Sequence, residues 1–463
     1  MRLAILSGLL LLSCICSLGA EDVASLYRQH CAVCHGPRGA SGLGGSLVSG
    51  QWQFASDDPG DQARVIREGL LPEQNMQGFG EVLDETQIRG LVVYLQELRA
   101  RAGQRIGPNP AGGVVQTALH GYRVESLVDA GLSVPWAVAL LPDGGLLITE
   151  RPGRLRIWDP ATGLVDEAVR GLPEITATGQ GGLMDVVLHP DHADNGLVYL
   201  SLSDPRDGGV FTAVARGRIR DGAWVDHEWI ARFDERFHTR SGFHFGCRLV
   251  LHDGMLYFGI GDRGRKNLAR DLAHPNGKIF RLHDDGRVPA DNPFVEQSKA
   301  LPGIWSYGHR NPQGLAMDPV GSVLYSTEHG PRGGDELNRI EPGADYGWPL
   351  VTHGINYNGT PITERTTAPG ITDPLRAWVP SPAFSGLVVY RGKAFPDWQG
   401  DLLAGSLKAE ELRRLRVAAD GSVTEEIILR DRGRIRTLRV DADGSILVVV
   451  NEPDAVLRLV PAD

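Results

Sequence analysis

The sequence predicts a mainly β protein, in which a six-bladed β-propeller follows a small all-α domain. Three observations carry this prediction. The 463 residues include 59 glycines and 29 prolines, which is typical of a turn-rich β protein. Six similar segments recur after residue 113, and the clearest amphipathic helix pattern lies before residue 102. We therefore expect the helical domain at residues 21–102 and the propeller at residues 114–463.

Each of the six segments joins a polar turn to a short apolar strand. Glycine after Asp or Asn suits a tight hairpin turn, and six repeats of this length match four-stranded propeller blades. The spacings between the turn glycines are 52, 58, 67, 79 and 44 residues, so insertions are expected in the wider gaps. The turn glycines are Gly144, Gly196, Gly254, Gly321, Gly400 and Gly444.

The first 20 residues predict an export signal. Arg2 precedes an apolar stretch from Leu3 to Leu12, which is too short for a membrane anchor. An alternative is lipoprotein processing, with Cys14 as the acylated residue. Either route takes the chain out of the cytoplasm, so we expect a periplasmic protein without a transmembrane segment.

The segment Cys31-Ala-Val-Cys-His35 is a motif for covalent attachment of heme c. Cys31 and Cys34 would bond the porphyrin, and His35 would ligate the iron. A thioredoxin-like cysteine pair is the alternative, which the adjacent histidine disfavours. Met76 lies among polar residues and glycines and is the expected sixth ligand of the iron.

Helices are expected at residues 22–29 and 84–101, where apolar residues repeat at helical spacing. With the heme motif between them, they resemble a small class I cytochrome c. Residues 103–113 contain glycine and proline but almost no apolar side chains, and they predict an interdomain linker. The net charge of −10 and the absence of a basic patch argue against nucleic acid as a partner.

Two polar clusters in the propeller carry candidate acid–base and binding groups. His244 lies between two phenylalanines and is a candidate general base, although a structural histidine is the alternative. Arg310 and Asn311 lie in the polar run Tyr307–Gly314, where Arg310 offers a fork for a carboxylate or a quinone oxygen.

Two further clusters indicate ions. Residues 328–336 combine acidic side chains with carbonyls exposed by glycines, and this suits Ca²⁺, although a solvated acidic turn is the alternative. Arg434 and Arg436 alternate along an expected strand, so they share one face and would bind a polyanion, and Lys408 could join them.

Together these clusters resemble the PQQ-dependent glucose/sorbosone dehydrogenase family over about residues 130–460. The most specific stretches are residues 179–191, Gly261-Asp-Arg-Gly264, Gly308-His-Arg-Asn-Pro-Gln-Gly314, Glu328-His-Gly-Pro331 and Asp345-Tyr-Gly-Trp-Pro349. The family's fold is a six-bladed propeller, in agreement with the repeats. Phe243 departs from the family, whose members often carry a polar residue there.

The resemblance implies a role for each matching residue. His244 would be the general base that takes the proton of the sugar's anomeric hydroxyl, and Gln180 would bind substrate. The residues implied to bind PQQ are Arg310, Asn311, Lys408, Arg434 and Arg436. The residues implied to bind Ca²⁺ are Gly330 and Pro331 through their carbonyls, with Glu336 and Tyr346 at a second calcium region.

The expected function is that of a quinohemoprotein dehydrogenase. It would oxidise aldose sugars to lactones with Ca²⁺-bound PQQ and pass single electrons to heme c. A downstream cytochrome or respiratory-chain component would then accept them. The alternatives are a heme-carrying propeller that binds a ligand or partner, and a calcium-dependent lactonase-type hydrolase. A cytochrome-type nitrite reductase is disfavoured because it needs eight blades and a second heme.

Overall fold

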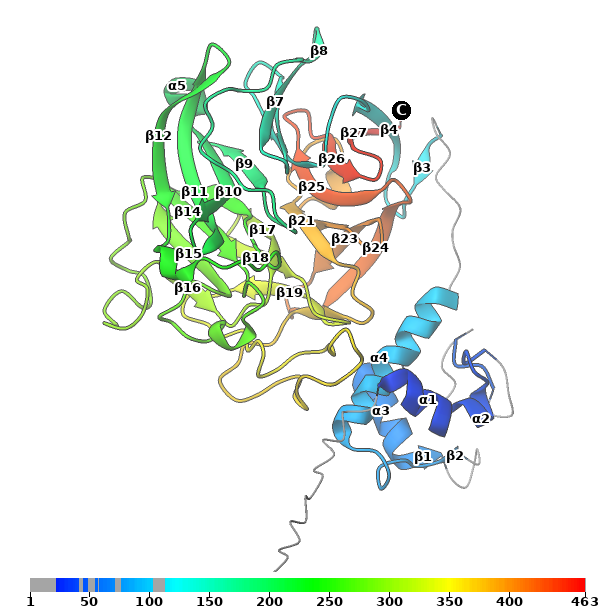
Figure 1. Cartoon of the computed structure of the whole chain (residues 1–463). Helices are drawn as coiled ribbons and strands as arrows, with labels where there is room; N and C mark the ends of the chain where they lie inside the picture. The colour runs from blue at the N-terminus through cyan, green and yellow to red at the C-terminus, as the bar shows by residue number, and fades with distance from the viewer. Residues whose placement is uncertain are drawn as a thin grey trace, which may run out of the picture.

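The structure is a computed structural model that describes residues 22–40, 45–48, 55–56, 58–70, 76–102 and 113–462. It has a helical domain beside a ring of sheets (Figure 1). The predicted export signal, with Cys14, lies outside the described residues, as do positions 103–112 of the predicted linker. The exact domain boundaries therefore stay a prediction. Within the described part of the chain, no helix is long and apolar enough to span a bilayer.

The described residues of the helical domain form four helices and one short hairpin. The helices are α1 (Val23–His30), α2 (Ala32–His35), α3 (Pro59–Glu68) and α4 (Glu85–Ala102). The hairpin pairs β1 (Gly69–Leu70) with β2 (Met76–Gln77). Asp22 caps α1 by accepting the N–H of Ala24 at 2.8 Å. The sequence analysis did not predict α3.

Helices α1, α3 and α4 enclose one apolar core. Leu26 of α1, Ile66 of α3 and Leu91 of α4 are buried in it. Cys31 and Met76 pack against the same core from opposite ends of the domain's sequence. The helical spacing of the apolar residues in α4 produces this arrangement, because it turns one face of the helix toward α1 and α3.

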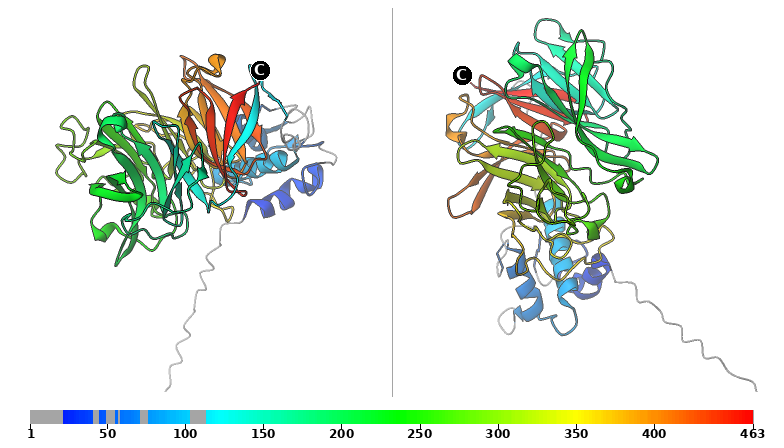
Figure 2. Two further views of the ribbon diagram at one scale, coloured as in Figure 1. Left: turned by 90° about the horizontal axis from the view of Figure 1, so that it is seen from above. Right: turned by 90° about the vertical axis from the view of Figure 1, so that its left-hand side faces the viewer.

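The remaining residues form six antiparallel sheets around a central axis (Figures 1 and 2), which confirms the predicted propeller. The first blade has β5 (Pro135–Leu140), β6 (Leu146–Glu150), β7 (Arg154–Asp159) and β8 (Gly163–Leu164). The second has β9 (Leu183–Leu188), β10 (Val198–Arg206), β11 (Gly209–Arg220) and β12 (Ala223–Ala231). The third has β13 (Leu249–His252), β14 (Met255–Ile260), β15 (Lys278–His283) and β16 (Ile304–Tyr307).

The fourth blade has β17 (Pro312–Asp318), β18 (Val323–Glu328), β19 (Asp335–Ile340) and β20 (Arg376–Trp378). The fifth has β21 (Phe384–Val389), β22 (Leu402–Ser406), β23 (Glu411–Val417) and β24 (Val423–Arg430). The sixth joins β25 (Arg434–Val440), β26 (Ile446–Asn451) and β27 (Ala455–Pro461) to β4 (Gly121–Val128) and β3 (Val115–Gln116). Pairing of β27 with β4 unites both ends of the domain in one sheet and closes the ring of blades.

The six turn glycines of the sequence repeat each stand before the second strand of a blade. All six adopt a positive φ, between 67° and 89°, as a tight turn at this place requires. The repeat is thus the hairpin between the first two strands of every blade. The widest spacing, between Gly321 and Gly400, contains the long loop between β19 and β20, which lies beside the helical domain (Figure 1).

Candidate functional site

The residues predicted to act as base, to bind PQQ and to bind the first Ca²⁺ gather at one end of the propeller channel. The first strands of neighbouring blades lie side by side around the axis, as β5 does with β9 and β25. His244, Arg310 and Arg434 stand at the starts of such first strands, β13, β17 and β25. Gly330 and Lys408 follow the second strands β18 and β22, which run antiparallel to the first strands and end at the same side. The fold therefore brings these residues together although they are far apart in sequence.

Two adjoining cavities open at this end and share His329. The larger has a volume of about 290 Å³ and the smaller about 80 Å³. The larger is lined by Glu97, His329, Gly330, Pro331, Arg332, Asp335, Tyr357, Ser381, Ala383 and Lys408. The smaller is lined by Trp136, Gln180, Met184, Phe245, Cys247, Gln313, His329, Leu407, Arg434 and Arg436.

His244 is held by a carboxylate behind it. Its Nδ1 lies 2.6 Å from Oδ1 of Asp262, and the other oxygen of Asp262 accepts the indole N–H of Trp348 at 2.8 Å. The backbone N–H of His244 donates to Oε1 of Gln180 at 2.8 Å. With Nδ1 directed at the carboxylate, Nε2 is the ring nitrogen left to accept a proton.

The environment of His244 keeps its ring neutral. Burial lowers the pKa of His244, the hydrogen bond that His244 donates to Asp262 raises it in part, and the charge of Arg310 lowers it further. The net pKa lies below the usual value of a histidine. At neutral pH the ring therefore carries no charge and has a free lone pair, as a general base requires.

Cationic side chains surround the cavities. Burial lowers the pKa of Arg436 to about 9, and the neighbouring Arg434 adds to this effect. The Nε atom of Arg436 and the Nε2 atom of His329 are buried without a hydrogen-bond partner among the described residues. Arg310 lies over the ring of Trp348 and donates to the carbonyl of His329 at 2.9 Å. Unsatisfied donors beside clustered cations fit a ligand with several carboxylates and carbonyl oxygens.

Gly330 and Pro331 lie side by side in the wall of the larger cavity. Among the described residues, no hydrogen bond ends on the carbonyl oxygens of Gly330 or Pro331, and both residues line the cavity. A Cβ on Gly330 would lie 2.2 Å from the backbone of Gly334, so the turn that presents these carbonyls requires glycine. Free carbonyl oxygens are suitable ligands for Ca²⁺.

Glu336 and Tyr346 lie apart from the two cavities. The hydroxyl of Tyr346 donates to the carbonyl of Arg339 at 2.5 Å, and its ring stacks on His309. Burial, with Glu328 beside it, raises the pKa of Glu336 to about 8. The described residues contain no group of three or more acidic, histidine or cysteine side chains poised for a metal ion. A second calcium region at these two residues stays a prediction.

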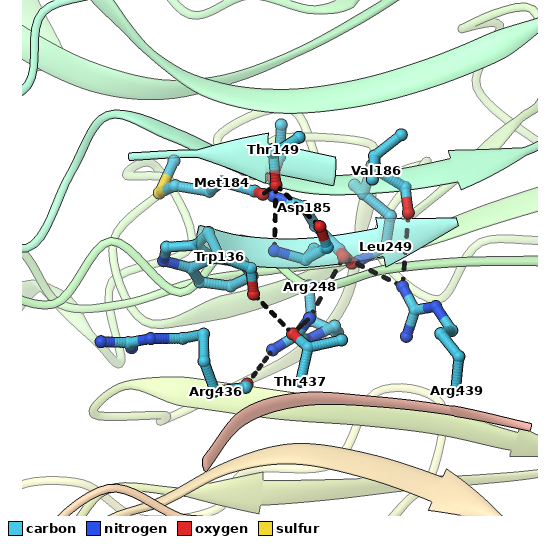
Figure 3. A network of polar contacts seen from close by, with 12 residues as sticks. Trp136, Thr149, Met184, Asp185, Val186, Arg248, Leu249, Arg436, Thr437 and Arg439 are labelled. Carbon is cyan, nitrogen blue, oxygen red and sulfur yellow. Dashed lines mark hydrogen bonds and ion pairs between the residues drawn. The ribbon is translucent and has the colours of Figure 1, made fainter. Parts of the chain in front are cut away.

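A buried polar network contacts Trp136, Met184 and Arg436, which line the smaller cavity (Figure 3). Arg248 of the third blade donates to Asp185 at 3.1 Å, to Thr437 at 2.7 Å and to the carbonyl of Arg436 at 3.1 Å. Its guanidinium also lies 4.4 Å from the ring centre of Trp136. The network links several blades across the channel and fixes the backbone that carries Arg436.

The heme motif of the helical domain is arranged for an iron ligand. Nδ1 of His35 lies 3.1 Å from the carbonyl oxygen of Gly45, which leaves Nε2 available to the metal. Burial and the nearby Cys34 raise the pKa of the Cys31 thiol to about 11. Cys31 and Met76 contact the same apolar core. These contacts are compatible with a covalently bound heme, and ligation of its iron by His35 and Met76 stays a prediction.

Several functional residues escaped the sequence analysis. Asp262, His329 and Trp348 lie within the stretches that carry the family resemblance, but their roles depend on contacts with distant segments. Trp136 stands in a strand of ordinary apolar composition. Glu97 belongs to the helical domain and nothing in its local sequence points to the propeller.

Comparisons with known proteins agree with this geometry. Residues 132–459 match the family described as Glucose / Sorbosone dehydrogenase, and residues 19–95 match the family described as Cytochrome C oxidase, cbb3-type, subunit III. Aldose sugar dehydrogenase YliI of Escherichia coli K12 is 43% identical over 335 residues, which are 71% of this chain and 90% of that protein.

Solved structures are similar as well. The soluble aldose sugar dehydrogenase of Escherichia coli, in its apo form, is 42% identical with a TM-score of 0.69, over 74% of this chain and 100% of that one. The PQQ-bound aldose sugar dehydrogenase of Streptomyces coelicolor is 26% identical with a TM-score of 0.59, over 76% of this chain and 99% of that one. The chain thus carries an N-terminal cytochrome c domain, and its propeller belongs to the glucose/sorbosone dehydrogenase family.

Proposed function

We propose that the protein is an exported quinohemoprotein that oxidises aldose sugars to lactones. The observation that carries this proposal is the pairing of His244 with Asp262, next to Gln180, which lines the smaller cavity together with Arg434 and Arg436. It combines a neutral base with binding groups for a polyanionic cofactor. A PQQ-bound relative and relatives named as aldose sugar dehydrogenases support the same cofactor and substrate class.

Different residues of the pocket would bind different parts of PQQ and Ca²⁺. Lys408, Arg434 and Arg436 would hold the three carboxylates of PQQ, and Arg310 with Asn311 would lie beside its quinone oxygens. The carbonyls of Gly330 and Pro331 would hold Ca²⁺. Bound there, Ca²⁺ and PQQ supply an electrophilic carbon that accepts a hydride.

His244 performs the proton transfer. Its Nε2 accepts the proton of the sugar's anomeric hydroxyl while the hydrogen on C1 leaves as hydride. Asp262 holds the ring in the required tautomer and stabilises the imidazolium that forms. Gln180 orients the backbone of His244 and contributes a polar group at the substrate side. The oxidation of a sugar hemiacetal to a lactone releases two electrons and two protons.

The heme domain receives the electrons. Cys31, Cys34, His35 and Met76 would hold heme c, which carries one electron at a time to a cytochrome or another respiratory component. A methionine ligand raises the reduction potential and favours electron transfer over oxygen binding. Neither a lactonase nor a partner-binding propeller requires this cationic pocket or the heme, so the dehydrogenase is favoured over both.

The proposal is tested by reconstitution. Purified heme protein is incubated with PQQ and Ca²⁺, aldoses are added, and the heme absorbance is followed. We expect heme reduction that depends on sugar, PQQ and Ca²⁺. Absence of reduction with every sugar and simple alcohol would refute the function. His244→Ala should bind PQQ normally and lose turnover by about 10²- to 10⁴-fold, and unchanged turnover would mean that another group is the base.

A further inference from the structure

The heme domain contributes directly to the wall of the larger cavity. Glu97 of α4 lines this cavity together with Gly330, Pro331 and Arg332 of the propeller. Glu97 is only 6% exposed, although it is an ionisable residue on a helix surface. Figure 2 shows the helical domain against the same side of the propeller as the loop between β19 and β20.

The link between the domains is a paired hydrogen bond. Nε and Nη2 of Arg332 contact the two carboxylate oxygens of Glu97, at distances from 2.6 to 3.1 Å. Arg332 immediately follows Pro331 in the chain. A two-pronged contact of this kind fixes direction as well as distance, so the position of α4 fixes the position of Arg332.

The segment that contains Arg332 depends on contacts from both domains for its conformation. Within the propeller, the N–H of Gly330 donates to Asp335 at 3.0 Å, and the N–H of Gly334 donates to the carbonyl of Trp378 at 2.7 Å. Residues 330–334 contain three glycines, and Gly333 and Gly334 have φ values of 81° and 77°. Glycine makes such a turn possible but leaves it many alternative conformations. The backbone of Arg332 is tied on its other side to Ile355, with both N–H···O distances at 3.0 Å.

Apolar and polar contacts around the ion pair keep the domains together. Val23 and Val93 of the heme domain form a buried cluster with Ile355 of the propeller. Arg89 of α4 donates to the carbonyls of Thr352 at 2.5 Å and Thr363 at 3.0 Å. The interface thus surrounds the loop that presents the carbonyls of Gly330 and Pro331.

We propose that the cofactor pocket is a two-domain site, in which Glu97 of the heme domain is a positioning residue for the segment 330–334. Through Arg332, Glu97 holds the carbonyls of Gly330 and Pro331 in place and closes the outer side of the pocket. The heme domain thereby slows the release of Ca²⁺ and PQQ, besides accepting electrons. This inference rests on the proposed function for the identity of the ligand only.

The test compares Glu97→Gln with a matched control, Glu85→Gln. Glu85 also lies on α4 and also forms a two-pronged ion pair, with both contacts at 2.6 Å, but its partner Arg67 belongs to the heme domain. Holoprotein is treated with a Ca²⁺ chelator, and the release of PQQ is followed by absorbance. We expect release about 10-fold faster in Glu97→Gln and still faster in Glu97→Lys, whose charge repels Arg332. Glu85→Gln should release PQQ at the wild-type rate.

A second measurement does not depend on cofactor. Hydrogen exchange of the amides in residues 330–334 is measured on the apoprotein, with the heme spectrum as a control for folding. Exchange should be faster in Glu97→Gln and unchanged in Glu85→Gln. Wild-type exchange in Glu97→Gln overturns the inference, and so does faster exchange with an unchanged release rate. Equal effects of both substitutions overturn it as well, because they would reflect a loosened helix. If wild-type protein binds no PQQ, the proposed function fails. The exchange measurement alone then decides whether Glu97 positions the segment 330–334.

Discussion

Asp262→Asn tests the hydrogen-bonded pair on which the proposed chemistry depends. In the wild type, Oδ1 of Asp262 accepts from the N–H of Gly264 at 2.7 Å and faces Nδ1 of His244, while Oδ2 accepts from Trp348. An asparagine has only one oxygen for these three groups. If the amide oxygen of the asparagine faces Trp348, its NH₂ group lies against the N–H of Gly264, which leaves two donors facing each other. The same NH₂ group would donate to Nδ1 of His244 and so favour the tautomer with the proton on Nε2. The opposite orientation sets two donors against each other at Trp348.

The expected fall in kcat follows from the hydrogen bonds that the substitution removes. A hydrogen bond to a charged group contributes about 1.5–3 kcal/mol, and a tenfold change in rate corresponds to about 1.4 kcal/mol. The tautomer that blocks Nε2 adds to the loss, so we expect kcat to fall about 100-fold. Because Asp262 raises the pKa of His244, its removal lowers that pKa. Activity requires the neutral ring, so the acid limb of the kcat profile should move to lower pH.

The assay is steady-state sugar oxidation with a soluble dye as acceptor, at saturating PQQ and Ca²⁺ and over a range of pH. Asp284→Asn is the matched control. Asp284 contacts His189 at 3.1 Å in the same propeller, but neither residue lines the cavities. The control should keep the wild-type rate and pH profile. Wild-type kcat in Asp262→Asn, or an acid limb that does not move, would refute the assignment of His244 as an Asp262-oriented base.

Three further outcomes are expected. Met76→His should lower the midpoint potential of the heme by on the order of 0.1 V or more in a redox titration, and an unchanged potential would show that Met76 does not ligate the iron. Arg248→Met should lower the free energy of unfolding by about 3 kcal/mol, because it leaves the buried Asp185 without one of its cations. Arg458→Met is the control, because the ion pair of Arg458 with Asp443 is partly exposed, and it should lower the free energy of unfolding by less than about 1 kcal/mol. Equal losses for the two substitutions in denaturant titrations would contradict the proposed role of Arg248. Burial, with Arg89 nearby, lowers the pKa of His353 to about 4, against contributions from Asp373 and Asp58 that raise it. The folded state then loses stability as the pH falls from 6.5 toward 4, so His353→Gln should be more stable relative to wild type by about 2 kcal/mol at pH 5 than at pH 7.5. A constant difference across this range would exclude His353 as the titrating group.

Some residues of the candidate site could be predicted from the sequence, whereas others could be identified only in the structure. The heme motif, the candidate general base and the cationic residues could be predicted because each stands in a short, distinctive pattern. Asp262 was visible in such a pattern, but its contact with His244 spans the gap between two strands, and its role emerged from the fold. Arg248 looked like an ordinary residue beside Cys247, although it lies at the centre of the buried polar network.

The sequence by itself determined the number of blades and the chemistry that the chain carries. The glycine at each hairpin turn is required by the local backbone conformation. The heme motif and the alternating arginines also depend only on residues that are close together in the sequence. Only the tertiary structure decided which of these groups meet. The contact between Glu97 and Arg332 joins residues 235 positions apart, and that between Arg248 and Thr437 joins residues 189 apart. Such contacts arise from closing the ring and docking the helical domain. No periodicity along the chain encodes them, because their geometry depends on every element between the two partners.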